Sequence, residues 1–366
     1  MSGSAVVIPI APRLQPDRYL VPDVARGVAI LAMLIAHAGP IMVAQPAATE
    51  FLQGQLNDLA SPLFATTMGA AAAIVLAKAG GNRGAVRAVR AVIVQNVLRG
   101  LVLVLLGLLL ETWGSWIAIV LAFLGIVLAV GTPLVLLGSR ALIAVLAVLL
   151  LLGAPLNDAV LVATGPLITT GERTPASLLL EWLFLNPHYR VTNLLPWFLF
   201  GALLLRIRFG GRRTGWILLA IAVPAWWLGP LWRGATGQEF SASGSYLDSL
   251  HDAGLVLLTL GLIILLASIR GRPAAAAVVA AVFLPFRAIG SVSLSLYVFQ
   301  VGVVALMAAS GIRFGSTDPV AWLVLVLGVP MVGILWWRFL GKGPLEVLIG
   351  VFTGRYRALT HPAKAA

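Results

Sequence analysis

A histidine and an aspartate, His37 and Asp58, are the residues of this chain best suited by type and position to proton chemistry. His37 ends an apolar run that begins after Arg26. An imidazole titrates near neutral pH, so His37 is a candidate general base toward an amine or a hydroxyl. Ionisable groups are costly to bury in an apolar slab, and this cost favours a functional role. The alternative is a packing histidine that is hydrogen-bonded to a neighbouring carbonyl.

Asp58 opens a second apolar run, with Pro62 in what would be its first helical turn. This pattern has two interpretations. An aspartate before a helical run is a common N-cap, and proline is tolerated in the turn that follows. Alternatively, Asp58 is the acid of an acid–base pair, and it orients His37 or holds the incoming nucleophile.

Three arginines are candidates for binding the phosphates of a substrate that enters from the cytoplasm, namely Arg26, Arg99 and Arg287. Guanidinium groups suit this role because their N–H groups match the geometry of phosphate oxygens. Arg26 and His37 are about three helical turns apart, so they share one face with a separation of about 16 Å. Arg99 lies inside an apolar run, where an arginine normally faces the bundle and has a partner. Anchoring at the membrane interface is the alternative for Arg26.

Other polar residues are candidates for substrate contacts. Ser293, Tyr297 and Gln300 form one stripe at helical spacing, which serves interhelical hydrogen bonding or lines a polar tunnel. His188 and His251 lie in or beside the two longest polar connections, at the mouth of the expected bundle. No ligand spacing typical of a metal site and no nucleotide-binding motif is present, so we predict no metal.

The composition places these residues in an all-α, polytopic membrane protein. The 366 residues are 60% hydrophobic and only 10% charged, with a mean hydropathy of +1.01. Soluble proteins are about a quarter charged. Cysteine is absent from the sequence, which excludes disulfides and thiolate chemistry. We expect a single membrane domain, residues 1–366, with about ten spans. They are predicted near 24–44, 59–77, 91–110, 115–137, 139–155, 192–208, 214–232, 250–269, 287–309 and 319–338.

Charge distribution predicts the orientation of the bundle. If residue 1 is cytoplasmic, the inner side and inner span ends hold all but four of the 25 Lys and Arg residues, while most acidic residues lie outside. By the positive-inside rule both termini are cytoplasmic, and we expect a bacterial cytoplasmic membrane. The basic side then faces anionic lipid, and no nucleic-acid partner is expected. The four outer arginines are Arg173, Arg190, Arg233 and Arg313.

Two short apolar segments leave their placement open. The alanine-rich run 274–284 is too short to cross, so we expect it at the inner interface or as a re-entrant segment. The small residues 69–73 permit close helix packing, either within one chain or in a homo-oligomer.

Motifs at both ends of the chain resemble the transmembrane acyltransferase superfamily. The front pattern resembles its heparan-α-glucosaminide N-acetyltransferase-like branch, and the back pattern resembles the signature of the bacterial YeiB-like family. The middle of the chain matches only in hydropathy. The front residues are Asp23-x-x-Arg26-Gly27, Asp58-Leu59-x-x-Pro62-Leu63-Phe64 and Met68-Gly69; the back residues are Gly290-Ser291-x-Ser293-x-x-x-Tyr297-x-x-Gln300 and Gly343-Pro344-Leu345-Glu346.

The resemblance implies transfer of an acyl group from cytoplasmic acyl-coenzyme A, such as acetyl-coenzyme A, to an outer sugar or lipid-linked glycan. His37 stands where the acetyltransferase branch has an asparagine, and Asp58 matches its aspartate. Ala48 replaces the branch's loop histidine, a departure that leaves the branch's mechanism and its aminosugar acceptor open. His37 is similar instead to the first-span histidine of the acyltransferase-3 family.

Two other functions fit the same pattern. Ten spans divided five plus five would give inverted halves, as in transporters and flippases. However, residues 1–155 and 192–338 show no convincing similarity to each other. The other function is a catalytically silent scaffold, because a fold does not guarantee chemistry.

Overall fold

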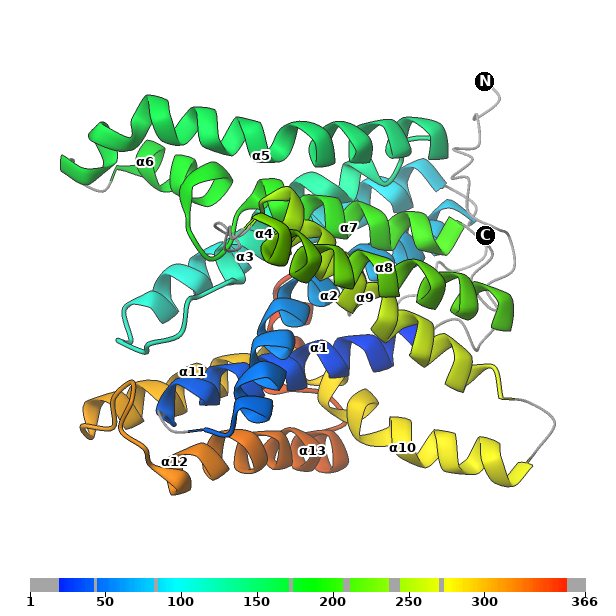
Figure 1. The fold of residues 1–366 in the computed structure, drawn as a ribbon. Coiled ribbons are helices and arrows are strands. Elements are labelled where there is room, and N and C mark those ends of the chain that lie inside the picture. The colour runs from blue at the N-terminus through cyan, green and yellow to red at the C-terminus, as the bar shows by residue number, and fades with distance from the viewer. Residues whose placement is uncertain are drawn as a thin grey trace.

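The computed structural model describes residues 20–42, 45–81, 85–170, 174–206, 211–236, 244–269 and 273–353. Within these ranges the predicted all-α fold is confirmed, and no strand is present (Figure 1). The elements are α1 (Leu20–Ala38), η2 (Gly39–Ile41), α2 (Ala47–Gly80), α3 (Ala85–Glu111), α4 (Leu121–Leu134), α5 (Ser139–Thr170), α6 (Pro175–Leu180), η3 (Glu181–Leu185), α7 (Val191–Arg206), α8 (Arg212–Thr236), α9 (Tyr246–Ala267), α10 (Pro273–Ser291), α11 (Ser293–Ala309), α12 (Pro319–Leu323), η4 (Val324–Gly328), α13 (Val329–Leu340) and α14 (Pro344–Phe352).

In this described part, eight helical segments are long and apolar enough to cross a membrane. Apolar side chains on their outer faces remain exposed, as lipid-facing positions would be. These properties are those of a polytopic integral membrane protein. The eight segments are Leu20–Ile41, Ala47–Gly80, Ala85–Glu111, Ser139–Thr164, Arg212–Thr236, Tyr246–Ala267, Ala274–Ser291 and Pro319–Leu340.

The predicted spans differ from the observed helices at several places: α2 begins at Ala47 instead of 59, and α5 continues to Thr170 instead of ending at 155. The span expected at 287–309 is divided, because α10 ends at Ser291 and α11 starts at Ser293. Figure 1 shows α11 following α10 in the same general direction. The prediction that the alanine-rich run 274–284 is too short to cross is wrong, because the run is part of α10, and Ala274–Ser291 is one of the eight segments long and apolar enough to span a membrane. The span expected from 115 begins only at Leu121, since residues 112–120 form a turn and an irregular segment.

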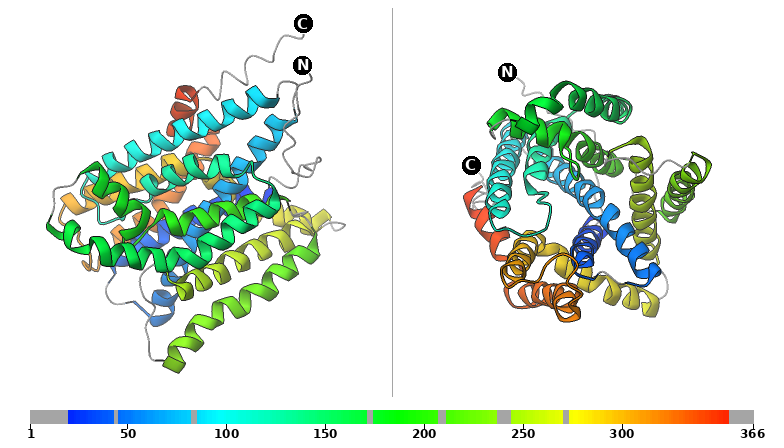
Figure 2. Two further views of the ribbon diagram at one scale, coloured as in Figure 1. Left: turned by 90° about the horizontal axis from the view of Figure 1, so that it is seen from above. Right: turned by 60° about the vertical axis from the view of Figure 1, so that its left-hand side comes forward.

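Helix α1 lies at the centre of the bundle, surrounded by helices from both halves of the chain (Figure 2, right). It packs mainly on α2 and α10, with further contacts to α9, α11, η4 and α13. Side chains along its length are fully buried, including Ala25 near its start and Leu34 near its end. The central position explains why the aliphatic residues of α1 are small or tightly packed.

Close helix crossings account for two glycines of the recognised motifs. A Cβ atom on Gly27 of α1 would lie 1.8 Å from the carbonyl oxygen of Phe286 on α10. A Cβ atom on Gly69 of α2 would lie 1.8 Å from the carbonyl oxygen of Phe198 on α7. Only a residue without a side chain permits backbones to approach this closely, and small residues are used in this way in membrane bundles.

The first prediction concerns these crossings. Gly27→Ala and Gly69→Ala should each lower the stability of the solubilised protein by about 1–3 kcal/mol, because the new methyl groups would push packed backbones apart. Thermal unfolding in detergent measures the effect. Gly54→Ala is the matched control: no atom lies within 4 Å of a Cβ there. Gly54 is exposed within α2, so alanine should be neutral or stabilising at this position. Equal stability of all three variants would contradict the packing argument.

Candidate functional site

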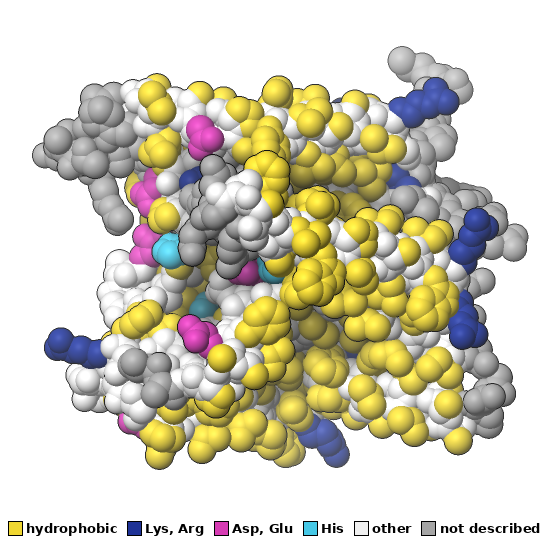
Figure 3. All heavy atoms as spheres, in the orientation of Figure 1, with side chains coloured by type: hydrophobic (Ala, Val, Ile, Leu, Met, Phe, Trp, Pro, Cys, Tyr) yellow, Lys and Arg dark blue, Asp and Glu magenta, His cyan; other side chains and the backbone are white. Residues whose placement is uncertain are grey.

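The two ends of the bundle carry opposite charge. In Figure 3, lysine and arginine side chains gather mainly at the right, whereas acidic and histidine side chains gather at the left around a hollow in this face. We call this second region the acidic end. It contains three carboxylates and two histidines that the following paragraphs describe, and it lies at the end that the positive-inside rule places outside. Its central residues are His37, Asp58, Asp248, His251 and Asp252.

His37 is held at the end of α1 by Gln300 of α11. Its Nδ1 lies 3.1 Å from Oε1 of Gln300, and Nε2 of Gln300 donates to the backbone oxygen of Leu34 at 3.2 Å. Gln300 is fully buried. Because the amide nitrogen faces Leu34, the oxygen faces His37, and an amide oxygen only accepts. Nδ1 of His37 therefore carries the proton, which leaves Nε2 as the basic nitrogen of the ring.

Tyr297 lies one turn before Gln300 and anchors the irregular segment between α3 and α4. The backbone nitrogen of Val120 donates to the Tyr297 hydroxyl at 3.3 Å. In the middle of the segment, Nε1 of Trp116 donates to the backbone oxygen of His37 at 3.4 Å. Ser293 is buried at the start of α11. The polar stripe thus serves mainly interhelical hydrogen bonds.

Asp58 lies against His251, which α9 brings to the acidic end. Oδ2 of Asp58 is 3.6 Å from Nε2 of His251, an ion-pair distance. His251 is only 7% exposed, and its ring lies 6.1 Å from that of Trp226 on α8. Trp226 is itself fixed, since its Nε1 donates to Oε1 of Gln55 at 2.7 Å. An imidazole beside a carboxylate is the arrangement that enzymes use to orient a general base.

This geometry corrects the expected pairing of Asp58 with His37. Gln300 occupies Nδ1 of His37, and Asp58 faces His251. The reason is the packing of α9 against α2, which the sequence separation conceals. Asp58 also lies well inside α2, which begins at Ala47, so the N-cap interpretation is wrong.

Two further carboxylates of α9 lie beside this pair. Asp248 and Asp252 are near enough to Asp58 for mutual repulsion. Oδ2 of Asp248 accepts from the backbone nitrogen of Gly244 at 2.6 Å. Arg190 approaches Asp248 from the segment before α7 and offers opposite charge.

Residues 189 and 190 connect this carboxylate group to the rest of the acidic end. Burial raises the pKa of the Tyr189 phenol, against a hydrogen bond with Ser61, which lies one turn after Asp58 on α2. Tyr189 is also within electrostatic range of Tyr297. Burial lowers the pKa of Arg190, an effect that nearby carboxylates oppose. These interactions place a series of polar side chains between Gln300 and Asp58, the partners of His37 and His251.

His188 is exposed beside this region, and its backbone nitrogen donates to Oδ1 of Asn186 at 2.9 Å. Its ring lies 6.4 Å from that of Tyr189, at the rim of the acidic end. Of the four residues predicted to contact substrate, Tyr297, Gln300 and His251 are buried and His188 is at the surface.

Two of the three arginines predicted to hold phosphates adjoin, in the sequence, the crossing of α1 and α10. Arg26 and Arg287 stand next to Gly27 and Phe286, the residues at which α1 and α10 cross. Arg26 is half-buried and Arg287 is exposed. Arg99 is half-buried on α3, a helix that packs on α4 and α2 instead.

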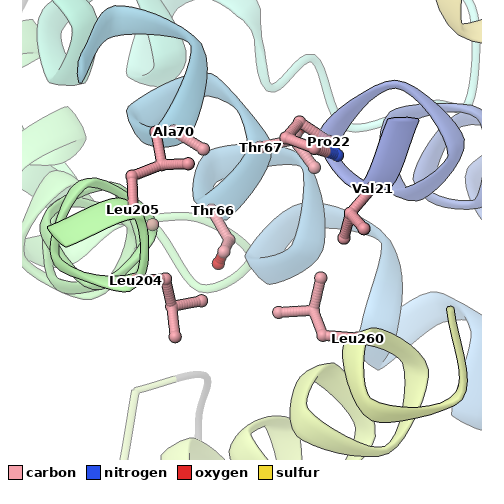
Figure 4. Close-up of a pocket in the computed structure, with 9 residues that line it drawn as sticks. Val21, Pro22, Thr66, Thr67, Ala70, Leu204, Leu205 and Leu260 are labelled. Atoms are coloured by element: carbon pink, nitrogen blue, oxygen red, sulfur yellow. The ribbon is translucent and has the colours of Figure 1, made fainter. Parts of the chain in front are cut away.

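A small recess opens on the basic half of the bundle, between α1, α2, α7 and α9 (Figure 4). Its volume is about 30 Å³. The hydroxyl groups of Thr66 and Thr67 donate to carbonyls of their own helix, so neither hydroxyl hydrogen is directed at a ligand in the recess. A space of this size holds about one water or methyl group and cannot take a coenzyme. It is lined by Val21, Pro22, Thr66, Thr67, Ala70, Gly201, Leu204, Leu205 and Leu260.

Sequence reasoning missed the role of the Gly-Pro-Leu-Glu motif. Oε1 of Glu346 accepts from the backbone nitrogens of Leu294 and Ser295 at 2.6 and 3.3 Å, and Oε2 accepts from the Ser295 hydroxyl. Glu346 thus caps the N-terminus of α11, the helix that carries Tyr297 and Gln300. A Cβ atom on Gly343 would lie 2.4 Å from the Ser295 hydroxyl oxygen, so this glycine permits the approach.

The second prediction tests this cap. Glu346→Ala should destabilise the solubilised protein by about 1–3 kcal/mol, because it leaves buried donors of α11 without an acceptor. Glu346→Gln keeps one acceptor oxygen and should fall between the alanine variant and the unmodified protein. Thermal unfolding of the three proteins is the measurement. A Glu346→Ala protein as stable as the unmodified one would show that α11 does not depend on the cap.

In the described residues, no group of three or more His, Asp or Glu side chains could hold a metal ion. Neither a curated protein nor a solved structure matches this chain. Residues 208–355, which include α8 to α14, match a family model described as "Protein of unknown function (DUF418)". DUF418 is the YeiB-like family, so the resemblance read from the C-terminal motifs is confirmed for this part of the chain.

Proposed function

We propose that this protein is a membrane-embedded acyltransferase that acts on an amine or hydroxyl acceptor at the acidic end. The observation that carries the proposal is the pair of His251 with Asp58, 3.6 Å apart, in which the imidazole is buried and the carboxylate, with its side chain 37% exposed, remains open to an acceptor. A buried imidazole beside a carboxylate is costly in a membrane bundle, and groups retained at such cost are usually functional. The front and back motifs add the resemblance to acyltransferases.

In this proposal, His251 removes the proton of the acceptor. With Nε2 directed at Asp58, Nδ1 is the basic nitrogen, and Asp58 stabilises the imidazolium that forms. The acceptor nitrogen or oxygen bonds to the acyl carbon while the carbon–sulfur bond of acyl-coenzyme A breaks. The coenzyme leaves as a thiolate and receives the proton from His251 directly or through water.

His37 is the second base candidate of the same region. Gln300 fixes its tautomer so that Nε2 is basic, and a series of polar side chains runs from Gln300 toward Asp58, the partner of His251. Two histidines of defined tautomer suit a reaction in which one proton leaves the acceptor and another reaches the thiolate. Arg26 and Arg287 lie at the opposite end of α1, where they suit the phosphates of acyl-coenzyme A, with Arg99 as a further contact.

The third prediction tests these roles. Purified protein in liposomes should transfer radiolabelled acetyl groups from acetyl-coenzyme A to a bacterial envelope glycan or glycolipid extract. His251→Asn and Asp58→Asn should each lower the rate by about 100-fold or more, because general base catalysis contributes on this scale. Glu50→Gln, an outer charge change at an exposed position of α2, is the control and should leave the rate unchanged.

Three results would contradict the proposal: no binding of acetyl-coenzyme A, full activity of both His251→Asn and Asp58→Asn, or passage of a solute through the liposome membrane without any covalent product. The last result would favour a transporter or flippase. The proposed setting is the bacterial cytoplasmic membrane, with lipids around the bundle and the acceptor on the outer side.

A further inference from the structure

Three carboxylates lie within electrostatic range of one another at the acidic end, and among the described side chains they outnumber the positive charges beside them. Asp58 comes from α2, while Asp248 and Asp252 come from neighbouring turns of α9. Asp252 is within range of repulsion from both of the others. Such a group of like charges is unfavourable in a poorly solvated region unless positive charge joins it.

Two of the three carboxylates have a partner of their own. Asp58 faces His251 at 3.6 Å. Asp248 accepts from the Gly244 backbone nitrogen and is attracted by Arg190, whose Nε donates to the backbone oxygen of Asn186 at 3.0 Å. These contacts hold the neighbouring elements together. They also engage His251 and Arg190, the basic groups that the described residues place nearby.

Asp252 differs from the other two. Its Oδ1 is shielded from solvent and has no hydrogen-bond partner within the described ranges. Its side chain is half-buried, so the carboxylate is shielded without being sealed in the core. A buried charged group that lacks a hydrogen bond lowers the stability of the folded protein. Such a group is retained where a bound ligand supplies the missing hydrogen bond.

The surroundings indicate the chemistry of that ligand. The described part of the chain offers no set of three ligands for a metal ion. A positively charged N–H group satisfies a carboxylate and also benefits from nearby aromatic faces. Trp226 lies next to His251 with its ring plane tilted by 33°, and Trp227 packs edge-on against Trp226 at 5.1 Å.

We infer that the acidic end binds an organic ammonium group, with Asp252 as its main anion and Asp58 and Asp248 as neighbouring charges. This inference rests on the proposed function, because it identifies the acceptor as an amine. The bound ammonium group then lies beside His251, which takes its proton before the neutral amine attacks the acyl carbon.

The fourth prediction tests the inference without an acyl donor. 1,4-Diaminobutane should bind the full-length purified protein in isothermal titration calorimetry, whereas 1,4-butanediol, of equal length and no charge, should not. Asp252→Asn should weaken binding of the diamine at least 10-fold. Glu50→Gln, which removes one exposed acidic charge elsewhere on the outer side, should leave the affinity unchanged.

A stability measurement separates a binding role from a structural one. Without ligand, Asp252→Asn should raise the Tm by about 2 °C or more, because it removes a buried, uncompensated charge. A lowered Tm would show that Asp252 stabilises the fold, and this would overturn the inference. Equal binding of the diamine and the diol, or displacement of the diamine by Na⁺ or Mg²⁺ at equal concentration, would also overturn it.

The same experiment distinguishes failure of the inference from failure of the proposed function. Diamine binding that depends on Asp252, with no acyl transfer, would support the ammonium site and contradict the proposed enzymatic function. Acyl transfer to a hydroxyl acceptor, with no diamine binding, would support the proposed function and overturn the ammonium site.

Discussion

Polar groups inside an apolar bundle must find partners within the protein, because lipid offers none. This constraint explains most of the side-chain contacts at the acidic end. Gln300 joins α11 to α1 by satisfying both His37 and a backbone carbonyl, and Asp58 joins α2 to α9 through His251. Glu346 extends the same principle to the start of α11. The polar residues therefore determine which helices meet, while the small residues determine how closely they approach.

The signature residues divide into those that set backbone distances and those that carry polar groups. Gly27 and Gly69 permit contacts that any side chain would prevent, and Gly343 permits the cap on α11. Tyr297 and Gln300 project from the helix that this cap stabilises. A change in the packing of α1 against α10 would consequently move His37 relative to Gln300. In this way, residues far from the acidic end control the geometry of its histidines.

The class of fold could be predicted from the sequence because hydropathy and the absence of long polar segments determine it. The interruption at Val292 could not, since residues 287–309 read as one apolar run and only the cap from Glu346 explains why a new helix begins at Ser293. Residues 116–120 are also apolar, yet contacts from Trp116 and Tyr297 hold part of this segment outside a helix. For the site, residue types identified His37, Asp58 and His251. Their pairing depends on how α9 packs against α2, and no local pattern encodes this packing.

The central claim is that Asp58 acts through His251 in acyl transfer, and a double-mutant cycle on acetyl transfer in liposomes tests it most directly. The account predicts that Asp58→Asn combined with His251→Asn is no slower than His251→Asn alone, because residues that act as one unit are not additive. Losses that multiply across the two positions would mean that the two side chains act independently. Such a result would contradict the account.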